Sequence, residues 1–125
     1  LDNVGLNRPG LPRIPLWFGS ETGEAALRRV ARLADGWMSL GDPAPELPRL
    51  RQYVQEAGRD PQALMVRGPL LAGGGGAAAW VAGAQRLQAA GVTHLNIVAP
   101  LDFSPAEALP RVIEARRAVA AALAP

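Results

Sequence analysis

Residues 14–37, IPLWFGSETGEAALRRVARLADGW, carry the clearest structural pattern in this chain of 125 residues. The apolar run at 14–18 is typical of a short buried strand. Small polar residues follow it, and over 24–34 apolar residues recur at helical spacing. Residues 37–40 then predict a second strand. The stretch is therefore expected to form strand, loop, helix and strand, with Thr22 near the helix start as its N-cap.

Further strands and helices are expected to follow in alternation. They are a helix over 46–57, a strand over 64–72, a helix over 77–90, a strand over 93–98 and a helix over 105–123. Gly58 is placed to end the first of these helices. Ser104, Pro105 and Glu107 form a capping-box sequence at the start of the last one.

This order of elements predicts an α/β fold with a parallel sheet and right-handed crossovers, at about 30 residues per unit. Two architectures fit the pattern. One is a small doubly wound sheet, and the other is half of a (β/α)₈ barrel, which takes about 250 residues when complete. Residues 1–13 contain two Gly and two Pro and are expected to be an irregular lead-in, with the domain proper at 14–125.

Composition excludes several classes of function. Hydrophobic residues make up 49% of the chain and charged residues 19%, which is typical of a globular protein. The 13 basic residues, all Arg, are spread among 11 acidic ones, so no nucleic-acid footprint is expected. The absence of Cys and the presence of a single His exclude disulfides and thiolate or multi-His metal sites. No apolar run approaches the roughly 20 residues of a membrane span, and a cytoplasmic location is the default expectation.

The local sequence resembles the second half of the luciferase-like flavin or deazaflavin oxidoreductases. Residues 14–37 are similar to the family's strand, small polar loop and AALRRAARLGDGW-like helix. EAGRDP at 56–61 and AGVTHL at 90–95 resemble the turn and strand entry that follow in that family. The resemblance implies an α/β fold of four βα units like the C-terminal half of a (β/α)₈ TIM barrel, with the first four units absent. Gly19-Ser20 departs from the commoner Gly-Gly pair.

The same resemblance implies a cofactor. The intact enzyme would use FMN with oxygen as a monooxygenase, or coenzyme F420 for hydride transfer. Its phosphate would be held by the loop Gly19, Ser20, Glu21, Thr22 and Gly23, where a strand end meets a helix N-terminus with free N–H groups. An ordinary βα turn is the plain alternative for this loop. No catalytic residue can be assigned.

A half barrel would expose unpaired strand edges and an apolar inner face. We therefore expect a partner, either the missing N-terminal half-barrel or a second copy in a homo-oligomer, and a small-molecule substrate. Two alternatives stay open: a non-catalytic truncated module or assembly subunit that binds no flavin, and an independent doubly wound domain that binds another phosphorylated ligand.

Other conspicuous residues are expected to be structural. The glycine run 73–76 follows the third strand, so it predicts a loop or connector rather than a dinucleotide site. His94 lies at the wrong end of its strand for a barrel active site, whereas Asn96 is a candidate for the barrel interior. Asp35 is expected to shape the turn after its helix. Packing anchors are expected at Trp17, Trp37 and Trp80.

Overall fold

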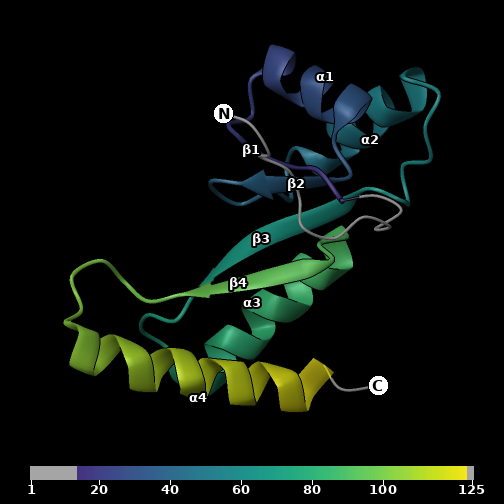
Figure 1. The fold of residues 1–125 in the computed structure, drawn as a ribbon. Helices are drawn as coiled ribbons and strands as arrows, with labels where there is room; N and C mark the ends of the chain where they lie inside the picture. Colours follow the sequence, from purple (N-terminus) through teal and green to yellow (C-terminus); the bar gives the residue numbers. More distant parts are fainter. Residues whose placement is uncertain (1–13, 124–125) are drawn as a thin grey trace, which may run out of the picture.

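The computed structural model describes residues 14–123, in which four strands and four helices alternate (Figure 1). In chain order they are β1 (Trp17–Ser20), α1 (Glu24–Leu33), β2 (Gly36–Ser39), α2 (Leu47–Glu56), β3 (Met65–Leu71), α3 (Gly76–Ala90), β4 (His94–Val98) and α4 (Pro105–Leu123). All neighbouring strands pair in parallel, in the order β1-β2-β3-β4. The expected lead-in at 1–13 lies outside the described residues.

The helices cover one face of this sheet. Phe18, Trp37 and Val66 lie opposite one another in the strand register, and all three pack into the helix-covered core. Leu95 and Ile97 of β4 do the same. A doubly wound sheet would carry helices on both faces and a reversal in its strand order. The fold is therefore α/β with four parallel βα units, which matches part of a (β/α)₈ barrel.

The core forms two clusters. The larger one lies between α1, α2 and the first strands, where Trp37, Leu50 and Val54 are fully buried. The smaller one lies between α3, α4 and the end of β3, and includes Trp80. Leu95 packs against both. Figure 1 shows the same division, with α1 and α2 together at one end of the sheet and α3 and α4 at the other.

The EAGRDP turn, which follows α2 in the sequence, contacts the end of α1. Gly58 ends α2 in a left-handed conformation with φ of 72°, as its position predicted, and its N–H donates to the Gln55 carbonyl at 2.9 Å. The next residue, Arg59, donates from Nη1 to the carbonyl of Ala31 at 2.7 Å and from Nη2 to that of Ala34 at 2.6 Å. Arg59 thus satisfies carbonyl groups at the end of α1 that have no partner inside the helix.

The expected start of α4 is confirmed. The N–H of Ser104 donates to Glu107 Oε2 at 2.9 Å, and its hydroxyl donates to the same oxygen at 2.5 Å. These hydrogen bonds from Ser104 lower the pKa of the Glu107 carboxyl. The carboxylate arm of the capping box is therefore formed.

Two local expectations in the opening stretch are wrong. The first strand begins at Trp17, because Pro15 has no N–H and the N–H of Leu16 donates to Asp35 Oδ2 at 2.8 Å instead of to the sheet. Thr22 is not the N-cap of α1. That position belongs to Gly23, since the helix begins one residue later than a Thr22 cap requires.

Candidate functional site

The five candidate cofactor residues lie at the edge of the sheet formed by the carboxyl ends of the strands. Gly19 and Ser20 end β1, and Glu21, Thr22 and Gly23 connect it to α1. Parallel α/β folds bind their ligands at this edge. The shift of β1 therefore places two of the five residues in a strand and leaves a loop of three.

The N-terminus of α1 keeps its backbone donors open. Gly23 at the N-cap supplies no side-chain hydrogen bond. The first N–H groups of a helix have no acceptor inside it, so those of α1 point toward the loop. Glu24 does not turn back to them, because its Oε1 accepts from Arg28 Nε at 2.8 Å. That hydrogen bond lowers the pKa of the Glu24 carboxyl and compensates its charge beside the helix end.

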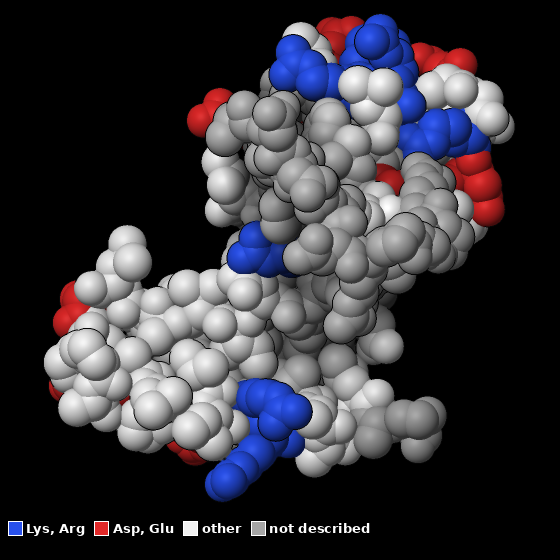
Figure 2. Space-filling view, viewed as in Figure 1, with Lys and Arg blue, Asp and Glu red and all other residues white. Residues whose placement is uncertain are grey.

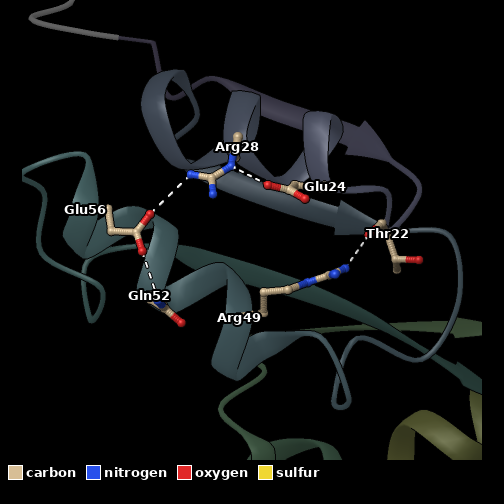
Figure 3. A network of polar contacts seen from close by, with 6 residues as sticks. All are labelled: Thr22, Glu24, Arg28, Arg49, Gln52 and Glu56. Atoms are coloured by element: carbon tan, nitrogen blue, oxygen red, sulfur yellow. Dashed lines mark hydrogen bonds and ion pairs between the residues drawn. The ribbon is translucent and has the colours of Figure 1, made fainter.

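The loop is held on both sides of Glu21. The indole Nε1 of Trp37 donates to Ser20 Oγ at 3.0 Å, which leaves the Ser20 hydroxyl proton free to donate. Arg49 Nη2 donates to the Thr22 carbonyl at 2.7 Å (Figure 3). The same nitrogen forms an ion pair with Glu46 at 2.7 Å. Residues of β2 and α2 therefore fix the shape of the β1–α1 loop without blocking the helix N-terminus.

Charges of both signs lie between α1 and α2. Arg28 of α1 bonds Glu24 on its own helix and, at 3.2 Å, Glu56 on α2 (Figure 3). Its guanidinium also lies 4.0 Å from the centre of the Tyr53 ring. Figure 2 shows basic and acidic side chains interleaved over this end of the molecule. Arg28 and Arg49 are thus compensated by neighbouring carboxylates.

The face of the sheet opposite the helices contains a cavity of about 500 Å³. We call this surface the concave face. The cavity is lined by Ser39, Leu40, Arg67, Pro69, Leu71, Asn96 and Val98. Arg67 is its only charged lining residue, while Leu40 is 72% and Leu71 59% exposed. Asn96 lies on this face, as its position in the last strand predicted. None of the five loop residues lines the cavity.

Two aromatic rings meet at the opposite end of the sheet, where the strands begin. The Trp17 ring meets the His94 ring edge-on, with centroids 5.1 Å apart, and a Cβ added to Gly36 would lie 2.4 Å from the Trp17 indole. His94 Nδ1 is hydrogen bonded to Thr93 Oγ1 at 2.8 Å. His94 therefore makes structural contacts, and it lies at the amino end of its strand, as its position in the sequence predicted.

The remaining candidates also have structural positions. The Asp35 carboxylate accepts from the Leu16 N–H, and the Asp35 N–H donates to the Leu16 carbonyl, so Asp35 shapes the start of β2. Trp37 and Trp80 are buried packing anchors. Gly75 and Gly76 have φ of 89° and 65° and form the start of α3, as a connector would.

Two residues escaped the sequence-based prediction. Arg67 could have been noticed, because it is the only charged residue in the apolar run at 64–72. Arg49 gave no local signal, since its contact with Thr22 spans 27 positions in the chain. Within residues 14–123 no cluster of His, Cys, Asp or Glu could hold a metal ion, and no helix is long and apolar enough to cross a membrane.

A solved structure shares this arrangement. It is the coenzyme F420-dependent tetrahydromethanopterin reductase from Methanopyrus kandleri, with a TM-score of 0.60 and 14% sequence identity. The match covers 82% of this chain and 48% of that one, so this chain spans about half the length of the reductase. At this identity the likeness shows a shared fold. A search of curated protein sequences found no match.

A family comparison covers almost the whole sequence. The model of the luciferase-like monooxygenases matches residues 4–122. The matched range includes all four βα units and the loop between β1 and α1. The chain therefore belongs to the luciferase-like monooxygenase family.

Proposed function

We propose that this chain is the C-terminal part of a flavin- or deazaflavin-dependent oxidoreductase, a monooxygenase or an F420-dependent hydride-transfer enzyme. Its contribution is to bind the cofactor phosphate and to form one wall of the barrel. The phosphate contacts come from Gly19, Ser20, Glu21, Thr22 and Gly23, and the cofactor is FMN or coenzyme F420. The substrate is a small molecule.

One observation carries the proposal: the open N-terminus of α1 at the ligand-binding edge of a sheet that belongs to this family. Backbone N–H groups and the helix dipole favour an anion at such a position. The loop before it is held by Trp37 and Arg49, so little conformational entropy is lost when an anion binds. These features fit a phosphate group.

The concave face supports the proposal that this chain forms one wall of a barrel. Exposed Leu40 and Leu71 flank its cavity, and an apolar surface of this kind favours burial against another protein surface. A second four-unit half-barrel would cover it and pair the free edges of β1 and β4. That half is a further N-terminal half-barrel or a second copy of this chain. The bound cofactor would supply the redox chemistry, while this chain orients its phosphate and excludes water from its side of the barrel.

Titration with pairs of ligands tests the phosphate site. We expect FMN fluorescence to be quenched by the chain, with a dissociation constant at least about tenfold lower than that of riboflavin, which lacks the phosphate. F420 is titrated in parallel by its own fluorescence, and the tighter ligand identifies the cofactor. Inorganic phosphate should compete with FMN.

The alternative function gives a different result. A non-catalytic half-barrel module or assembly subunit would not quench the fluorescence of FMN, riboflavin or F420 at concentrations up to millimolar. Equal affinity for FMN and riboflavin would also contradict the proposed phosphate site, because it would show that the loop makes no contact with the charged group.

A further inference from the structure

Arg67 is the only charged residue in the four strands, and it lies on the concave face. The apolar residues around the cavity are Leu40, Pro69, Leu71 and Val98, and its uncharged polar residues are Ser39 and Asn96. The strands contain no Asp or Glu at all. In the part of the chain that the structure describes, the Arg67 side chain has no ion pair or hydrogen bond, and only its backbone is paired in the sheet.

The depth of Arg67 in the sheet separates it from the ligand edge. It is the third residue of β3 and pairs with Met38 of β2 and with His94, the first residue of β4. Pro69 and Leu71 lie on the same face between Arg67 and the carboxyl end of β3. In a complete eight-stranded barrel, this depth is filled by layers of side chains, and ligands bind above them. The partner of Arg67 is thus expected to be a protein side chain.

Covering the concave face would remove Arg67 from water. Burial of an arginine without a counter-charge is strongly unfavourable, because the lost hydration is not replaced. A carboxylate with bidentate geometry restores much of that loss. The covering surface must therefore carry an Asp or Glu at the height of Arg67.

A second copy of this chain cannot provide that group. If two copies closed a barrel about a two-fold axis, each strand would face its own copy across the interior, so β3 would lie opposite β3. Two Arg67 guanidinium groups would then meet in an interior only wide enough for side chains. The like charges would repel, and no acidic residue of either sheet could separate them.

We propose that Arg67 selects the partner of the concave face: a four-unit half-barrel of different sequence that places a carboxylate opposite Arg67, and not a second copy of this chain. This inference rests on the proposed half-barrel function and decides between its two candidate partners. It does not depend on which cofactor binds.

Charge reversal in one copy tests the proposal with this chain alone. The variant Arg67→Glu is mixed with the wild-type protein, so that a closed two-copy barrel would pair Arg67 of one copy with the introduced glutamate of the other. Sedimentation velocity should show a defined 1:1 dimer in the mixture, with a dissociation constant at least about 100-fold lower than that of either protein alone. Arg29→Glu, an equal charge change on the exposed side of α1, should not have this effect.

Other variants guard against misfolding and against an internal counter-charge. Arg67→Met removes the charge and keeps an apolar stem, so it should dimerise more tightly than wild type, with an unchanged circular dichroism spectrum. Asp2→Asn, introduced into both mixed proteins, should leave their dissociation constant unchanged, since Asp2 is the only acidic residue of 1–13. The proposal is overturned if wild type alone dimerises as tightly as the mixture, if the mixture does not associate, or if Asp2→Asn shifts the constant tenfold. The FMN titration is read separately and can fail or succeed on its own.

Discussion

Arg49 connects the candidate phosphate loop to α2 through a single side chain. It donates to the Thr22 carbonyl and is itself held by Glu46. We expect Arg49→Met to weaken FMN binding about three- to tenfold, the usual value of one hydrogen bond. The melting temperature should change little, because the side chain is exposed and surface ion pairs add little stability. Arg29→Met on α1 serves as the control. Unchanged FMN affinity in Arg49→Met would show that the loop does not depend on this anchor.

Gly36 is a position where one added methyl group should be felt. A Cβ there would lie 2.4 Å from the Trp17 indole, so the ring would have to move from its place against His94. We expect Gly36→Ala to lower the free energy of unfolding by about 1–3 kcal/mol, as overpacking does. Urea denaturation measures the change. In Trp17→Leu, the same Gly36→Ala substitution should cost much less, and an equal cost in both backgrounds would argue against the indole as the cause.

Short-range roles of single residues could be predicted from the sequence. Asp35 at the turn, Gly58 at the helix end and Asn96 on the inner face all follow from position within one element. The contacts of Arg49 and Arg59 could not be predicted in this way, because they join residues more than 20 positions apart. Which carbonyl an arginine reaches depends on how two helices pack.

The start of α4 depends on the bonds between Ser104 and Glu107. The pKa of Glu107 is lowered by these bonds, so the charged carboxylate stabilises the folded state above its ordinary pKa. This contribution is lost as the pH falls through the lowered pKa of the folded protein. We expect Glu107→Ala to melt earlier than wild type at pH 7, with the difference shrinking below about pH 4. Thermal melts at both pH values measure it, with Glu114→Ala, an exposed position of the same helix, as the control. A difference that persisted at low pH would contradict this role.

The type and order of all eight elements could be predicted from hydrophobic spacing, and most of their ends from Gly, Pro and capping residues. The exception is β1, which begins at Trp17 rather than at residue 14. Its apolar run alone does not show which residues pair. The start of β1 is set by Asp35, because the Leu16 N–H donates to the Asp35 carboxylate and not to a strand neighbour.

Within residues 14–123, no element covers the concave face or pairs with the outer edges of β1 and β4. Leu40 and Leu71 are more than half exposed there. We expect the isolated chain at micromolar concentration to sediment as a broad mixture and not as a uniform monomer, because apolar surface and free edges promote association. The double variant Leu40→Gln with Leu71→Gln should move the distribution toward monomer, whereas Leu109→Gln on α4 should move it less. A sharp monomer peak for the wild-type chain would contradict this expectation.

The parallel fold follows from the sequence because each βα unit repeats one local pattern. The identity of the partner does not follow from the sequence, because the alternation of apolar residues shows which face of a strand is buried but not which surface covers it. The loop lies between the first strand and the first helix, as the sequence predicted, and its binding of a phosphate stays a prediction. The position of Arg67 on the concave face became evident only when four strands were placed side by side.

The division of the core into two clusters has a consequence for local unfolding. Of the 19 residues of α4, only Ala115 and Val119 are buried, and both belong to the smaller cluster. The helix can therefore detach while Trp37 and its neighbours stay packed. Amide protons of α4 should exchange with deuterium well before those of α1 and β2. A partner seated against this helix would slow that exchange, so protection of α4 would report whether the proposed half-barrel partner is bound.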